Sequence, residues 1–201
     1  AAMSMAWKPP KLTGRTASQG SAGLILLVIV IAVVSAVLDE RGSRVPESHL
    51  APGEPLPEYA ASSLDGSGVS IGEFRGRVVL LSFWATWCSE CVEQLPEFQA
   101  LKDEVGDQGL ELISVSIDDQ DRAWVQSFLG GGEHVWLNLF DDVAHINQVF
   151  GWGSRIPKTV LVNRDGTVGV WWRGRMDPTS PENRALIDEA MSGRAVWRPE
   201  G

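Results

Sequence analysis

Two cysteines occur in the 201-residue chain, and they lie three positions apart. Cys88 and Cys91 stand in the run Trp87-Cys88-Ser89-Glu90-Cys91, directly after a run of apolar β-forming residues, 78–84. If a helix begins here, its first N–H groups lack intrahelical partners and its dipole stabilises a thiolate. Thiols in such C-x-x-C pairs titrate at about 3.5–7.5 instead of about 8.5. We therefore expect Cys88 to be the exposed attacking thiolate and Cys91, one turn on and more buried, the resolving thiol.

Three other interpretations of the pair are weaker. A closed zinc site needs four nitrogen or sulfur ligands, and no two of the candidate histidines (His49, His134 and His145) have ligand spacing. A structural disulfide that closes so short a loop restricts the unfolded chain little. Two unconnected core cysteines would leave their spacing unexplained. The pattern favours a redox-active pair and no metal site.

The surrounding sequence alternates between strand-like and helix-like segments. Strands are predicted at 59–63, 69–71, 78–84, 110–117, 135–140, 159–163 and 168–172, and helices at 89–105, 120–129, 143–150 and 181–192. Alternation of this kind predicts an α/β fold in which helices cover both faces of a largely parallel sheet. A leading hairpin and a closing hairpin, turning at 164–166, add antiparallel strands.

The first part of the chain has the pattern of a membrane segment. Residues 16–38 carry no charge, and about 20 residues of helix cross the hydrocarbon layer, which predicts a span over 20–38. Lys8, Lys11 and Arg15 precede it, so we expect residues 1–19 in the cytoplasm and the rest outside. A cleaved signal peptide ending near 34–36 is the alternative. Either way, residues 39–55 form a proline-rich linker and residues 56–201 an exported domain.

Composition narrows the function further. The formal net charge of -9 argues against nucleic-acid binding, which needs clustered Lys and Arg. Hydrophobic residues make up 44% and charged residues 21% of the chain, as expected of a globular domain. The length suits one ordinary domain with a targeting segment.

Residues 79–91 resemble the active-site strand and helix of thioredoxins, and residues 92–98 are closer to the TlpA/ResA-type branch of exported, often membrane-anchored disulfide reductases. This resemblance implies a thioredoxin fold with an N-terminal β-hairpin, reduction of protein disulfides, and no bound cofactor. It also implies that Pro96 bends or interrupts the active-site helix. Ile156-Pro157 matches the cis-proline opposite the dithiol, where the Ile156 backbone would pair with an extended substrate segment.

Two departures from the family pattern concern proton transfer. Ser82 stands where cytosolic thioredoxins carry a buried Asp, and Gln94 stands where many TlpA/ResA-type members carry a Glu. Glu90, between the cysteines beside Ser89, is a candidate modulator. Its negative charge would disfavour the Cys88 thiolate and make the pair more reducing, although a solvated surface Glu is an equally good interpretation.

The aromatic, histidine and acidic residues near these segments have plainer expectations. Trp87 should shield the Cys88 sulfur and contact partners, and Trp84 should serve as core and site wall. His134 and His145 should be surface residues, and Asp141-Asp142 a helix cap. Trp171 and Trp172 alternate along a strand, which predicts one facing inward and one outward.

The resemblance implies a monomeric reductase of exported protein disulfides, such as apocytochrome c or other extracytoplasmic thiol proteins. A membrane-embedded thiol carrier would supply the electrons. The open alternatives are a thiol oxidant or isomerase, a thiol peroxidase, and a non-enzymatic metal-binding module. The last two are weaker because the expected Thr-x-x-Cys or Cys-x-x-x-Cys spacing is missing.

Overall fold

The computed structural model describes residues 25, 27–32, 50–105, 108–130, 136–151 and 153–198. The chain divides into two units, Ala1–Val45 and Pro46–Gly201. In the first unit, residues 25 and 27–32 are helical with exposed side chains. Within the described ranges, no helix has the length and apolarity needed to cross a bilayer. The predicted tail 1–19, most of the predicted span 20–38 and of the linker 39–55, and His49 and His134 lie outside the described residues.

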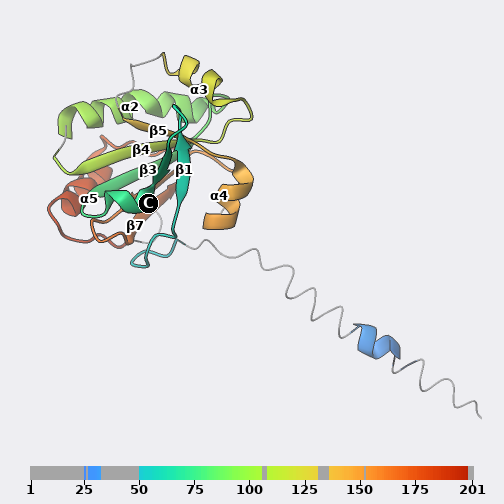
Figure 1. Cartoon of the computed structure of the whole chain (residues 1–201). Helices are drawn as coiled ribbons and strands as arrows, with labels where there is room; N and C mark the ends of the chain where they lie inside the picture. Colours follow the sequence, from blue (N-terminus) through green and yellow to red (C-terminus); the bar gives the residue numbers. More distant parts are fainter. Residues whose placement is uncertain are drawn as a thin grey trace, which may run out of the picture. The chain divides into compact units, whose positions relative to one another are not determined.

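A seven-stranded mixed sheet forms the centre of the second unit (Figure 1). Its strands lie in the order β2-β1-β5-β4-β3-β6-β7. Strand β3 pairs in parallel with β4, which pairs in parallel with β5, whereas the pairs β3–β6, β6–β7, β1–β5 and β1–β2 are antiparallel. The bounds are β1 Ala60–Ser63, β2 Gly68–Ser70, β3 Val78–Trp84, β4 Leu110–Ser116, β5 Leu137–Phe140, β6 Lys158–Val162 and β7 Val168–Arg173.

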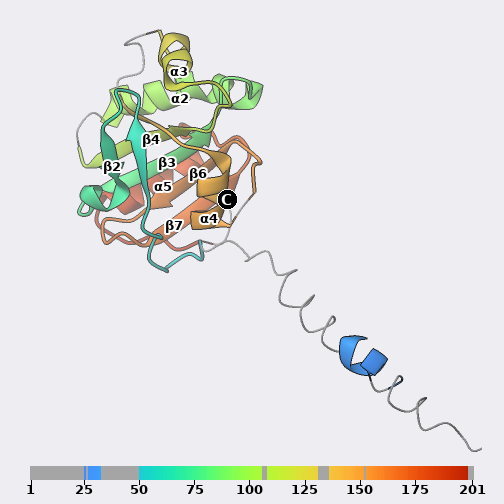
Figure 2. The same ribbon diagram turned by 45° about the vertical axis from the view of Figure 1, so that its right-hand side comes forward.

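Helices cover both faces of this sheet (Figures 1 and 2). Their bounds are η1 Ile71–Phe74, α2 Ser89–Val105, α3 Arg122–Phe128, α4 Val143–Phe150 and α5 Pro181–Met191. Polar caps begin four of them, with Ser70 accepting from Gly72 N, Asp121 from Trp124 N, Asp142 from His145 N and Ser180 from Asn183 N. The predicted cap at Asp141-Asp142 is therefore confirmed, with Asp142 as the N-cap. Helix α2 continues through Pro96, so Pro96 does not interrupt it, and the bend that was the other expectation stays a prediction.

The order of elements agrees with the sequence prediction, and most differences are one or two residues at the ends. Strand β3 and helices α2 and α4 have the predicted bounds. Helix α3 is shorter than predicted because Asp121 caps it, so residues 120 and 121 stay outside the helix. Strand β5 begins at Leu137, and residue 135, where the prediction began it, is not described.

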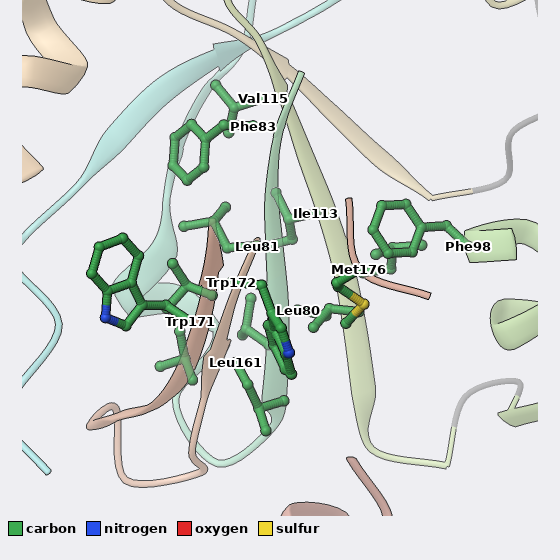
Figure 3. Close-up of a cluster of buried hydrophobic side chains, with 14 of the residues drawn as sticks. Leu80, Leu81, Phe83, Phe98, Ile113, Val115, Leu161, Trp171, Trp172 and Met176 are labelled. Atoms are coloured by element: carbon green, nitrogen blue, oxygen red, sulfur yellow. The ribbon is translucent and has the colours of Figure 1, made fainter. Parts of the chain in front are cut away.

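Each face of the central strands packs against different elements. On one face, Leu80 lies with Phe98 of α2 and with Met176 (Figure 3). Helices α5 and α2 are joined by an ion pair between Arg184 and Glu104 at 2.5 Å. On the other face, Phe83 contacts Phe150 of α4, with ring centroids 5.5 Å apart, and Tyr59, 6.1 Å apart. Strand β3, fully buried along its length, is thus held on both sides.

Trp171 and Trp172 point to opposite sides of β7, as the alternation predicted (Figure 3). However, both are buried, at 3% and 4% exposure. The expectation that one faces solvent is wrong, because helices and loops cover both faces of the sheet at β7. The side chain of Trp172 is also bonded to α5, donating from Nε1 to Asn183 Oδ1 at 3.1 Å.

The Phe83 side chain offers a test of this packing. Its replacement by alanine leaves a cavity between Tyr59 and Phe150, and we expect the free energy of unfolding to fall by about 3–5 kcal/mol. Urea denaturation followed by far-UV circular dichroism measures the change. Trp87→Ala, at a side chain that is 59% exposed, is the control and should change it by less than about 0.5 kcal/mol. Equal losses in the two variants would contradict the packing described.

Candidate active site

The two cysteines lie at the junction between β3 and α2. Strand β3 ends at Trp84, the chain turns with Cys88 N donating to Ala85 O at 3.1 Å, and α2 begins at Ser89. Cys88 and Cys91 form a disulfide with an S–S distance of 2.08 Å and a Cα–Cα distance of 5.2 Å. The strand–helix location predicted from the sequence is confirmed.

Backbone N–H groups in the first turn of α2 surround the Cys88 sulfur and carbonyl. Cys91 N lies 3.3 Å from Cys88 Sγ, and Val92 N donates to Cys88 O at 3.0 Å. The N–H of Cys91 has no acceptor within the helix, so it is available to a sulfur at residue 88. After reduction, the same N–H would donate to the Cys88 thiolate, and the helix dipole adds to that stabilisation.

Cys88 is more exposed than Cys91, as predicted, but it is less exposed than the prediction required. Cys91 is 1% exposed and Cys88 is 9% exposed. Cys88 is therefore far less open than expected, because its sulfur is bonded to Cys91 and turned toward the start of α2. The neighbouring Trp87 is 59% exposed, and Ser89 and Glu90 are exposed as well. The exposed surface next to Cys88 therefore consists of Trp87 and the first turn of α2.

Strand pairing brings Ile156 and Pro157 to the same edge of the sheet. The peptide bond between them is cis, as the resemblance implied. Lys158 pairs with Phe83 at the end of β3, so the two preceding residues extend alongside the chain that leads to Cys88. Pro157 is buried and accepts from Gly174 N at 2.9 Å, while Ile156 is half-buried.

The two positions that carry carboxylates in related sequences hold neutral, buried side chains. Ser82 is 2% exposed and accepts from Thr159 Oγ1 at 3.4 Å. Gln94 is 1% exposed and donates to the carbonyl oxygen of Met176. Each side chain has a hydrogen-bond partner, which a buried polar group requires. Neither can exchange a proton with Cys91 as a carboxylate would.

A buried carboxylate that the sequence prediction missed lies beside the cysteine loop. Asp118, 7% exposed, follows β4 and accepts from Thr86 N at 3.0 Å, from Thr86 Oγ1 at 2.5 Å and from Ser116 Oγ at 2.6 Å. Parallel strands end at the same edge, and β3 and β4 are parallel. The sequence signal was therefore an Asp just beyond the second buried strand. Asp118 fixes the loop two residues before Cys88.

A second missed residue, Lys158, lies next to Pro157. It is 3% exposed and shares the face of Phe83, because it pairs with Phe83 in β3 and with Arg173 in β7. Burial, and then the charges of Arg173 and Arg155, lower the pKa of the Lys158 ammonium from 10.5 to about 8. A lysine inside an otherwise apolar strand gave no signal that it would be buried.

His145 is part of a network on the α4 face of the sheet. Its Nδ1 lies 2.7 Å from Asp141 Oδ2, which also accepts from Tyr59 OH at 2.8 Å, and the Tyr59 and His145 rings stack. The side chain is 40% exposed, so the surface assignment is confirmed. These bonds join α4 to the segment before β1. In the described ranges, no three His, Cys, Asp or Glu side chains gather closely enough to hold a metal ion.

Comparison with known families agrees with this geometry. The Redoxin family matches residues 51–185, which include both cysteines and the cis-proline. This chain belongs to the Redoxin family. Its resemblance to ResA-type proteins is confirmed by curated relatives, and it is a thioredoxin-like thiol–disulfide oxidoreductase with Cys88 and Cys91 at disulfide distance.

Two of these relatives are named thiol-disulfide oxidoreductase ResA. The protein from Oceanobacillus iheyensis is 36% identical over 149 residues, covering 72% of this chain and 75% of the relative. The one from Bacillus thuringiensis is 27% identical over 145 residues, covering 72% and 82%. A solved structure titled as a putative thiol:disulfide interchange protein DsbE from Chlorobium tepidum superposes with a TM-score of 0.63. It is 23% identical, covers 71% of this chain and 99% of its own, and supports the thioredoxin fold.

The buried Lys158 predicts a pH dependence of stability in the disulfide form, in which the cysteines do not titrate. Its pKa is about 8 in the folded state and near 10.5 in the unfolded chain, so between these values the unfolded state binds more protons. Stability should therefore rise with pH across this window. Urea midpoints of the oxidised protein from pH 7 to 10.5 measure it.

Lys158→Met should flatten that rise, because methionine carries no proton to lose. Lys102→Met, at a partly exposed position of α2, is the matched control and should keep the wild-type slope. If the wild type and Lys158→Met changed in parallel with pH, Lys158 would not be the titrating group.

Proposed function

We propose that this protein is a membrane-anchored, extracytoplasmic reductase of protein disulfides. The observation that carries the proposal is the position of Cys88, whose sulfur lies 3.3 Å from the Cys91 N at the start of α2. The helix N-terminus stabilises a thiolate at this position, so Cys88 can attack a disulfide at neutral pH. The same stabilisation makes Cys88 a good leaving group when a mixed disulfide is resolved. Because this stabilisation of the reduced pair by itself favours an oxidant, the reductase direction rests on the resemblance of residues 92–98 to the TlpA/ResA-type branch.

The reaction is an exchange between two dithiol–disulfide couples. The Cys88 thiolate attacks one sulfur of the substrate disulfide, forming a mixed disulfide and releasing the other substrate sulfur as a thiolate, which takes up a proton. Cys91 then loses its proton and attacks Cys88 Sγ, releasing the second substrate sulfur as a thiolate, which also takes up a proton. One of the two protons is the one that Cys91 gives up, and the other is the one that Cys88 gave to solvent when it became a thiolate. Substrate gains two electrons and two protons, and the Cys88–Cys91 disulfide forms. Two electrons from a membrane thiol carrier would restore the dithiol.

Substrate positioning is assigned to Trp87, Ile156 and Pro157. The register of β3 with β6 supports this assignment, because it carries Ile156 and Pro157 alongside the residues that lead to Cys88. An extended substrate segment could pair with the Ile156 backbone, as in strand addition at a sheet edge. The exposed ring of Trp87 would cover the apolar part of that segment.

The anchor and the location rest on the sequence around residues 20–38. The described part of that stretch is helical, and its apolar side chains at 25 and 27–31 are 51–60% exposed, as expected of a helix that lies in lipid. Lysine and arginine precede the stretch, which favours a cytoplasmic N-terminus. An exported domain near the bilayer suits a membrane electron donor. Exported thiol proteins, apocytochrome c among them, are the proposed substrates, and the enzyme is proposed to act as a monomer without a cofactor or bound metal.

Serine variants of the two cysteines test their separate roles. Cys91→Ser should accumulate a mixed disulfide with a disulfide-bonded peptide, because Cys88 can attack but nothing resolves the product. Cys88→Ser should form no such adduct and lose at least about 10³-fold in turnover. Intact-mass spectrometry after acid quenching detects the adduct. An adduct of similar yield on Cys88→Ser would reverse the assignment.

The direction of exchange is tested by the reduction potential of the Cys88–Cys91 pair. We expect a value close to the roughly −270 mV of thioredoxin, not the roughly −120 mV of a strong oxidant such as DsbA. Equilibration in glutathione or dithiothreitol buffers, read by alkylation and mass spectrometry, gives it. Glu90→Gln should make the potential less negative, because it removes a negative charge beside the thiolate. A potential near that of DsbA would favour the thiol oxidant or isomerase instead.

A further inference from the structure

Three large aromatic side chains remain exposed around the cysteine loop. Trp87, next to Cys88, is 59% exposed, Trp124 of α3 is 52% exposed and Phe128, one turn later in α3, is 42% exposed. Exposed apolar side chains that gather in one region mark interaction sites more often than single exposed ones do. We call Trp87, Trp124 and Phe128 the aromatic surface.

Contacts with the cysteine loop place this surface at the active site. Trp124 Nε1 donates to Thr86 Oγ1 at 3.2 Å, and Thr86 is the residue before Trp87. The Phe128 ring lies 6.1 Å from that of Trp84, the last residue of β3. Both contacts join α3 to the chain that leads into Cys88, and α3 lies beside α2 in both views (Figures 1 and 2).

Hydrogen bonds hold the Trp124 ring of this surface in one orientation before any partner arrives. Asp118 accepts from both Thr86 N and Thr86 Oγ1, and the same Thr86 oxygen accepts from Trp124. The Trp124 ring is thereby oriented through two bonds from a buried carboxylate. A preoriented ring loses little conformational freedom on binding, which favours its use as an anchor for a partner.

We propose that the aromatic surface is a specificity site that binds a large apolar side chain close to the cysteine of a polypeptide substrate. The proposal rests on the proposed function, because a substrate disulfide must reach Cys88 and the surface is continuous with that point through Thr86 and Trp87. The occupant is an extended polypeptide whose cysteine is flanked by Phe or Leu. Tryptophan is among the residues that most often dominate the binding energy of an interface when a partner removes them from water.

Two disulfide-bonded peptides of equal length test the proposal, one with Phe and Leu beside its cysteines and one with Ser in those places. The reduced full-length protein should reduce the first at least about tenfold faster in kcat/KM, read by acid quenching and chromatography of the thiol peptide. Trp124→Ala should remove most of that preference. The rate with hydroxyethyl disulfide, which has no flanking side chains, should stay within about twofold.

Two matched variants separate binding from support of the loop. Trp124→Phe keeps an aromatic ring but lacks the bond to Thr86, and it should retain most of the preference for the Phe and Leu peptide. Trp197→Ala removes a tryptophan of equal exposure to Trp87, beside Gly53 at the other end of the sheet, and should change neither rate.

The outcomes distinguish this inference from the proposed function. Equal rates for the two peptides with the wild type would overturn the specificity site while leaving the reductase intact. An equal loss on peptide and on hydroxyethyl disulfide in Trp124→Ala would also overturn it, because the ring would then only support the loop. Absence of exchange with every disulfide, by contrast, would count against the proposed function itself.

Discussion

The parallel pairing of β3 with β4 is the constraint on which the site depends. Parallel strands end at the same edge of a sheet, so the residues that follow β3 and β4 meet there. Thr86 after β3 and Asp118 after β4 are joined in this way by two hydrogen bonds. Those bonds hold the turn from which Cys88 enters α2. The antiparallel pairing of β6 with β3 then brings Pro157 to the same place from the other side.

Given this strand pairing, few other groups in the structure bear on the chemistry of the dithiol. The helix supplies N–H groups to the sulfur of Cys88, while Ser82 and Gln94 leave the interior behind Cys91 without the carboxylates found in related proteins. Asp118 is buried nearby but is fully engaged with Thr86 and Ser116. Its charge acts on the loop that precedes the cysteines. The buried side chains at positions 82 and 94 therefore offer no carboxylate for proton exchange.

The fold also buries polar and charged side chains, and the free-energy cost of taking them out of water must be offset by other interactions. Lys158 lies in a strand that is buried along its whole length, and its ammonium shares that region with Arg173 and Arg155. Burial of a charge lowers stability unless partners or a lost proton compensate. On the same face, Tyr59, Asp141 and His145 form a satisfied network that joins α4 to the start of the domain. The sheet thus holds a charged side chain at the first residue of an inner strand and a polar network on the same face.

Resemblance to the TlpA/ResA-type branch pointed to the proline opposite the redox pair, and the sequence by itself determined the positions of β3, α2 and α4 and the spacing of that pair. These are encoded locally, by an unbroken β-forming run, a helical repeat and spacings of a few residues. Only the tertiary structure decided that Trp171 and Trp172 are both buried, that Asp118 holds Thr86, and that Trp124 reaches the cysteine loop. Each of these depends on which strands are neighbours and which faces are covered. Such contacts join residues 30 or more positions apart, and no local pattern in the chain records them.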